Sequence, residues 1–149
     1  MLLKKFPKTR GNERGGSLIE FTVVATVFFM MIVGIVSVAV LYFTHNALVD
    51  ATRRGARYAV LNPANSNTAV TNVVMYGTDN PPTGAIPLVY NLQPNNVSVN
   101  YAGMGVAAGR VTVTITGYTF PFILPTSTTS ITMPSYSTTL TGESAGVIP

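Results

Sequence analysis

The sequence predicts an α+β membrane protein, in which a long N-terminal transmembrane helix extends into a small, exported, antiparallel β-rich domain. Three patterns predict it: an apolar run at residues 21–43, a helical stripe continuing to residue 60, and alternating residues near 110–120. We therefore divide the chain into a cytoplasmic basic leader (1–15), a transmembrane and juxtamembrane helix (16–60) and a small exported β-rich domain (61–149).

The apolar run is long enough to cross a membrane. Residues 21–43 contain no side chain that is charged at pH 7. As a helix they would reach about 34 Å, against a hydrocarbon core of roughly 30 Å. A cleaved secretory signal has a shorter apolar region and a small-residue cleavage site. Residues 47–51, ALVDA, make a poor site of that kind, so we expect a permanent anchor.

The charge distribution predicts the orientation of this anchor. The net charge is +4, and most of the excess lies ahead of the apolar run, at Lys4, Lys5, Lys8, Arg10 and Arg14. The positive-inside rule then places the N terminus in the cytoplasm and exports the C-terminal part. Arg53, Arg54 and Arg57 on the other flank argue weakly for the reverse. Beyond Arg57 the chain has one Arg and no Lys, which excludes a basic nucleic-acid-binding face.

The helix is expected to continue past the membrane to residue 60. Leu48, Ala51, Gly55 and Tyr58 recur at three- and four-residue spacing and form one apolar stripe. The other side carries Asp50, spaced to pair with Arg53 or Arg54, together with Arg57. Two interpretations remain open for residues 53–58: a solvated face near lipid headgroups, which local evidence favours, or a surface that docks a partner helix. Within the membrane run, Gly34, Ser37 and Ala39 are either a small-residue face for helix packing or the scattered small residues common in membrane helices.

The remainder is expected to be β-rich. Asn62-Pro63 ends the helix, residues 70–76 are ambiguous between helix and strand, and residues 77–87 form a loop. Residues 96–101 and 110–120 are expected to pair as a hairpin, with Val111, Val113 and Ile115 on one face of the second strand. The PFILP segment at 121–125 is expected to be a break, and residues 126–140 to give one or two more strands.

The residues offer little for catalysis. The chain has no Cys and one His, His45, whose nearest acid, Asp50, is better explained by pairing with Arg. After residue 57 the only acids are Asp79 and Glu143, too few for a metal site. We therefore expect neither an enzyme nor a cofactor.

Glu20 is the one acid at the head of the apolar run. It is either an interfacial residue that favours the positive end of the helix, or an assembly device. In the second interpretation a protease cuts between Gly15 and Gly16, and the new amine and the Glu20 carboxylate form complementary charges between staggered neighbouring helices.

Two motifs give this chain a family resemblance. Residues 15–21, GGSLIEF, resemble a class III prepilin peptidase site, with Gly at the cut and Glu20-Phe21 following. Together with NALVDATRRGARYAV at 46–60, this segment resembles the TadE-like minor pseudopilins of tight-adherence (Tad/Flp) pilus systems, which are related to type IV pili. The resemblance covers the first 60 residues closely and the rest only in general character.

The resemblance implies that Gly15 ends the leader, that Gly16 begins the mature chain and that Glu20 and Phe21 serve processing or assembly. The second Gly leaves a cut after Gly16 as an alternative. The implied partners are the prepilin peptidase, other pilins or pseudopilins, and the Tad inner-membrane assembly platform, all in the membrane. The exported part is long for a major pilin, which favours a minor pseudopilin. The alternative function is a signal-anchored envelope or adhesion domain unrelated to a pilus.

Overall fold

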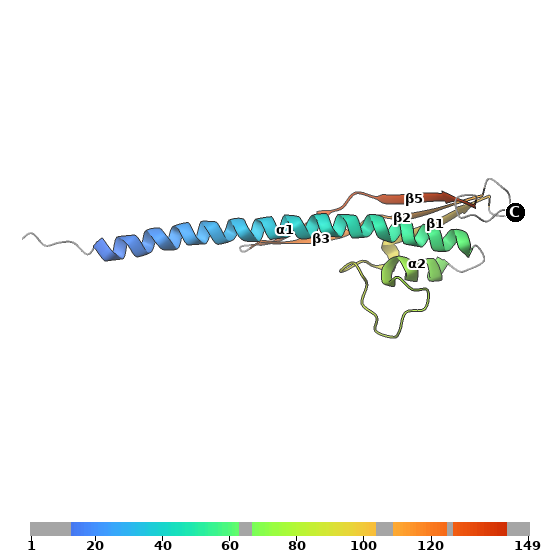
Figure 1. Ribbon diagram of the computed structural model, residues 1–149, viewed down its shortest axis with the longest axis horizontal. Coiled ribbons are helices and arrows are strands. Elements are labelled where there is room, and N and C mark those ends of the chain that lie inside the picture. The colour runs from blue at the N-terminus through green and yellow to red at the C-terminus, as the bar shows by residue number, and fades with distance from the viewer. Residues whose placement is uncertain (1–12, 63–66, 104–108, 125–126, 143–149) are drawn as a thin grey trace, which may run out of the picture.

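The protein is described by a computed structural model, which defines residues 13–62, 67–103, 109–124 and 127–142. One long helix, α1 (Glu13–Leu61), runs the length of the molecule (Figure 1). A short helix, α2 (Asn67–Tyr76), and a 3-10 turn, η1 (Pro94–Asn96), follow it. Five strands complete the order: β1 (Val97–Ala102), β2 (Arg110–Ile115), β3 (Thr119–Leu124), β4 (Ser127–Thr132) and β5 (Tyr136–Thr141).

The strands form two antiparallel sheets, one beside the C-terminal half of α1 and the other nearer its middle (Figure 1). One has the order β1-β2-β5, and the other is the hairpin β3-β4. In the first sheet Val99 pairs with Val113, and Val113 with Thr138. The predicted combination of a long apolar helix and a small antiparallel β-rich part is therefore confirmed.

The core lies between α1, α2 and the central strand β2. Val111, Val113 and Ile115 are fully buried, as their alternation predicts, while the threonines between them are only partly covered. On that other face Thr112 and Thr139 face each other across the strands, with their hydroxyl oxygens 2.8 Å apart. Period-two alternation thus separates a buried apolar face from a hydroxyl-rich one.

Three details differ from the sequence-based expectations. Residues 70–76 are helical, because Val70, Val73 and Val74 lie on one buried face of α2. The strand expected over 110–120 is interrupted at Gly117, which has a positive φ of 67° that favours glycine, so β2 ends and β3 begins around it. Most of the expected break at 121–125 is strand: Pro121 lies within β3, on a two-stranded sheet where a missing donor is tolerated.

Two further expectations about the strands are confirmed. Residues 97–102 and 110–115 do form the predicted antiparallel hairpin, and residues 126–140 supply two further strands, β4 and β5. Most of the predicted leader lies outside the described residues, and so do Pro63, Pro125 and Glu143.

Candidate assembly surface on the long helix

The N-terminal part of α1 is apolar and uncovered. Within the described residues, an apolar stretch of this helix is long enough to cross a membrane. Its most apolar 18 residues have a mean hydropathy of 2.8, and none of them is buried. Large side chains project from all sides, including Phe21 (72 % exposed), Phe29 and Met31. In water such a surface is unfavourable by roughly 25 cal/mol for each Å² exposed, so it requires lipid or another protein around it.

The threonine hydroxyl groups on this segment are satisfied within the helix. Thr22 donates to the carbonyl of Leu18 and Thr26 to that of Thr22, each at 2.8 Å. Threonine is polar, but this back-bonding pairs both of these hydroxyl donors. The segment is therefore compatible with a hydrocarbon surrounding, where unpaired polar groups cost several kcal/mol.

Glu20 is the exception on this surface. It is exposed, and it is the one side chain charged at pH 7 between Gly15 and Val49. Gly15 and Gly16 precede it in the first turns of α1, and a Cβ placed on either would meet nothing within 4 Å. Phe21 follows it and is equally uncovered. The structure thus places Gly15, Gly16, Glu20 and Phe21 together at an open helix end, all accessible from outside.

The helix changes character near Thr44. Thr44 is 8 % exposed and its hydroxyl donates to the Val40 carbonyl at 2.9 Å. Next to it, His45 Nδ1 lies 2.8 Å from the Tyr136 hydroxyl oxygen of β5, and the two rings meet edge to face. From here to Val60 one face of α1 is buried against the sheet and α2.

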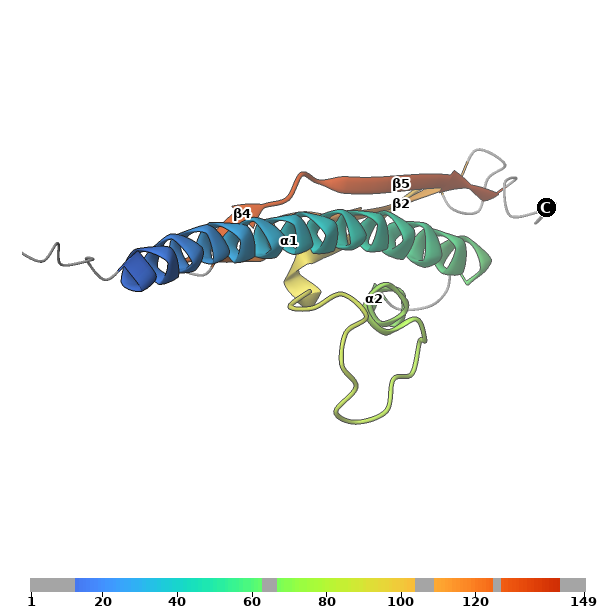
Figure 2. The same cartoon turned by 60° about the vertical axis from the view of Figure 1, so that its left-hand side comes forward.

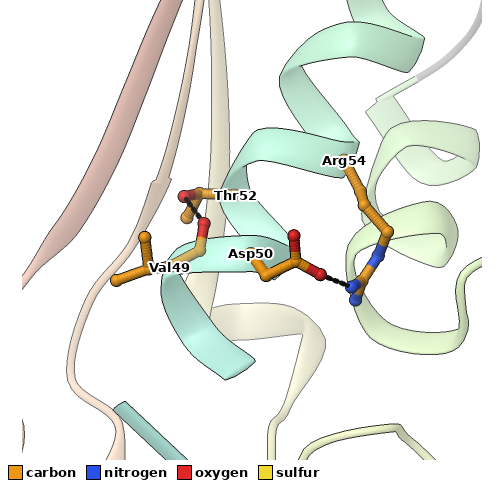
Figure 3. Close-up of polar contacts among 4 residues, drawn as sticks. All are labelled: Val49, Asp50, Thr52 and Arg54. Carbon is orange, nitrogen blue, oxygen red and sulfur yellow. Dashed lines mark hydrogen bonds and ion pairs between the residues drawn. The ribbon is translucent and has the colours of Figure 1, made fainter. Parts of the chain in front are cut away.

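The polar residues of this covered half bind mainly within the chain. Arg54 forms an ion pair with Asp50, the i,i+4 partner that the spacing allows, and Thr52 donates to the Val49 carbonyl at 2.8 Å (Figure 3). Thr52 is 1 % exposed, and its hydroxyl oxygen also lies 2.9 Å from that of Thr138. Sequence reasoning missed Thr52 and His45 as attachment points to β5, because a contact across 86 or 91 positions leaves no periodic signal.

Gly55 marks the closest approach of α1 to its neighbours. A Cβ there would lie 2.3 Å from Cγ2 of Val74 in α2 and 3.4 Å from Cγ1 of Val113 in β2. Tyr58, one turn on, donates its hydroxyl to the Asp79 carboxylate at 3.0 Å. The helix that docks at Gly55 is therefore α2 of the same chain.

Arg53 and Arg57 lie on the opposite, exposed side of α1. They keep both interpretations open: a solvated face, or docking to a further partner.

Burial raises the pKa of Tyr101 and Tyr136 in the neighbouring sheet, which keeps both hydroxyls protonated. Among the described residues, no group of three or more His, Cys, Asp or Glu could hold a metal ion.

These features define a class: a protein whose one N-terminal apolar helix fits a single-pass membrane anchor and carries a small β-rich domain on its C-terminal half. Residues 15–57 match the family model for TadE-like protein, and this match confirms the resemblance seen in the sequence. The match indicates a protein associated with a Tad pilus system. No curated protein and no solved structure shows significant similarity to the chain.

Proposed function

We propose that this protein is a minor pseudopilin of a Tad/Flp-type pilus system and supports pilus assembly or priming through helix–helix association. The observation that carries this proposal is the uncovered apolar half of α1 with Glu20 as its one charge, within the segment that matches the TadE-like family. The chain acts as a partner and a peptidase substrate, and it has no catalytic activity of its own.

In this proposal the protein is a single-pass protein of the inner membrane. The basic N terminus is cytoplasmic, and the β-rich domain is exported to the periplasm or cell surface. The asymmetry of Lys and Arg around the apolar run supports this orientation. The partners are the prepilin peptidase, other pilins or pseudopilins, and the inner-membrane platform of the Tad system.

Processing would begin at the glycines. Gly15 and Gly16 have open space around them, and glycine lowers helix stability by about 1 kcal/mol per residue relative to alanine. The first turns of α1 therefore unwind more readily than the apolar run behind them. A protease that must bind an extended peptide gains access there, and cleavage after Gly15 leaves the amine of Gly16 as the new N terminus.

Assembly would then use the charge that cleavage creates. The new amine and the Glu20 carboxylate are about 6 Å apart along the helix axis. Two copies, or a copy and a pilin, that are staggered by this distance place one amine beside the neighbour's carboxylate. In a low-dielectric surrounding such a pair attracts strongly, whereas either charge alone is costly. The pairing sets the register of otherwise uniform apolar helices.

Processing is tested by replacing Gly15. Gly15→Ala should reduce cleavage in cells that contain the peptidase, because the cut site must accept a side chain where there was none. Gly34→Ala, in the middle of the apolar run, is the matched control and should be cleaved normally. Mass spectrometry of the N terminus also distinguishes a cut after Gly15 from one after Gly16. If the unaltered chain retains residues 1–15 beside an active peptidase, the processed-pseudopilin proposal is wrong and a signal-anchored envelope or adhesion domain is favoured.

Assembly is tested by removing the charge of Glu20. Glu20→Ala and Glu20→Gln should insert into the membrane as before, yet reduce the number of pili per cell, because the neighbouring amine loses its counter-charge. Glu20→Asp keeps the charge and should retain more piliation than Glu20→Gln. Electron microscopy of pili, with membrane fractionation as the insertion control, gives both results. Equal piliation in all variants would contradict the charge-pair mechanism.

A further inference from the structure

An apolar groove separates the middle of α1 from the β3-β4 hairpin. Its volume is about 710 Å³. Ile32, Val36 and Val40 line it on the helix side, and Tyr90, Phe120 and Pro121 line it opposite. Both views show the hairpin lying along α1, with β3 beside the helix in Figure 1 and β4 beside it in Figure 2.

This placement limits how much of the apolar run can lie in hydrocarbon. The hairpin is a two-stranded sheet with two open edges, and open sheet edges exposed to lipid do not occur within the hydrocarbon region. The hydrocarbon layer must therefore end near the groove, although the apolar run continues to Phe43. A membrane span of about 20 residues that ends at Val36 begins near Ser17, which is then the other boundary of the hydrocarbon layer.

The groove wall has the chemistry of a membrane interface. Tyr90 is 76 % exposed and its backbone carbonyl accepts a hydrogen bond from the Tyr118 hydroxyl at 2.8 Å, which fixes it beside the groove. Tyrosine is enriched at the headgroup level, where its ring is apolar and its hydroxyl is wet. Pro121 has no N–H to leave unpaired, and its partner Ser130 on β4 carries a small exposed hydroxyl.

We propose that a lipid acyl chain occupies this groove, and that the β3-β4 hairpin and Tyr90 rest in the headgroup layer as a second membrane contact. Lipid is the occupant because the groove opens directly onto the uncovered apolar surface of α1, which lipid already surrounds if the helix is inserted. The inference thus rests on the membrane insertion proposed above. It also places Glu20 about 4.5 Å inside the hydrocarbon boundary near Ser17, at a depth where a carboxylate gains from a charged partner.

The absence of cysteine makes the test direct, because single-cysteine variants of the full chain need no background changes. We would label Tyr90→Cys, Ser130→Cys, Val27→Cys and Asn100→Cys with an environment-sensitive fluorophore, in phosphatidylcholine vesicles that contain nitroxide-labelled lipid. Val27 is 62 % exposed in the middle of the span, and Asn100 is exposed on β1 in the other sheet. Circular dichroism checks that each variant is folded.

We expect Tyr90→Cys and Ser130→Cys to be quenched by headgroup nitroxide at least about twofold more than Asn100→Cys, given a hydrocarbon layer of roughly 30 Å between the two interfaces. Val27→Cys should be quenched by mid-chain nitroxide and protected from aqueous iodide. Equal quenching of Tyr90→Cys, Ser130→Cys and Asn100→Cys, with Val27→Cys still quenched, would overturn the second contact while leaving the anchor intact. If the unlabelled Tyr90→Cys variant forms disulfide-linked dimers on addition of a mild oxidant, and the labelled variant shows no lipid quenching, the groove is assigned to a second copy and the proposal is overturned as well. An unquenched Val27→Cys would overturn the insertion itself.

Discussion

The two halves of α1 are both apolar, yet they use different residues. The uncovered half, residues 18–36, carries large side chains that project in all directions, among them Phe28, Phe29 and Met30. The covered half, residues 44–60, has mostly small residues on its buried face, Ala51, Thr52, Gly55, Ala56 and Ala59, together with the larger Leu48 and Val60. One continuous helix thus presents two kinds of apolar surface.

The difference follows from what each half contacts. Packing against a sheet and a second helix is closest where the side chains between the backbones are small, as around Gly55. A helix surrounded by lipid has no fixed neighbour to fit, so large branched and aromatic side chains are accommodated. Hydrophobicity alone therefore cannot distinguish the two halves, whereas the share of small residues on the buried face does.

The largest expected effect comes from truncating one large side chain in each half of α1 and comparing the stability of the two variants. Leu48 is fully buried, so Leu48→Ala should lower the free energy of unfolding of the β-rich domain by about 2–5 kcal/mol, through lost burial and a residual cavity. Phe29 is 64 % exposed, and Phe29→Ala should leave that stability unchanged. Thermal unfolding of the full chain in detergent, followed by the near-ultraviolet signal of its tyrosines, measures both. Similar losses in the two variants would show that the uncovered half is packed in solution.

The next effect comes from adding a methyl group at a glycine in each half. Gly55→Ala places a Cβ 2.3 Å from Val74, a stiff and fully buried side chain, so α2 must move. Overpacking of this kind costs about 1–3 kcal/mol, partly offset by the better helix propensity of alanine. Gly34→Ala meets nothing within 4 Å and should be neutral or slightly stabilising.

The same unfolding assay applies to both glycine variants. A stable Gly55→Ala protein would mean that α1 and α2 are not in close contact. A destabilised Gly34→Ala protein would indicate instead that the small-residue face at Gly34, Ser37 and Ala39 already packs against a partner helix in the preparation.

Periodicity made most of the fold predictable. The apolar run, the stripe from Leu48 to Tyr58 and the alternation around Val113 each depend on spacing within one element, and each is found. The end of β2 was missed because a strand can bend at Gly117 without any change in the surrounding Val and Thr pattern. Residues 70–76 were ambiguous because a short apolar run fits a buried helix and a buried strand equally well.

The sequence likewise predicted one part of the candidate site and not the other. Gly15, Gly16, Glu20 and Phe21 were predicted from a local motif, and the structure leaves all four accessible. At residues 53–58 the spacing predicted the pairing of Asp50 with Arg54, but it could not indicate that Gly55 faces α2. That contact depends on where α2 lies relative to α1, which no pattern within the α1 sequence predicts.

The smallest expected effect lies at the point where the two halves meet. Tyr136→Phe removes the hydroxyl that lies 2.8 Å from His45 Nδ1 but keeps the ring contact, and it should cost about 0.5–1.5 kcal/mol, the net value of one hydrogen bond. Because His45 is exposed, water can replace the lost partner, which places the expected value at the lower end. Tyr42→Phe, 66 % exposed on the uncovered side, is the matched control and should have no effect. If His45→Phe and Tyr136→Phe have additive effects in a double-mutant cycle, the bond contributes nothing. A coupling between them would show that it attaches β5 to the helix where the uncovered half begins.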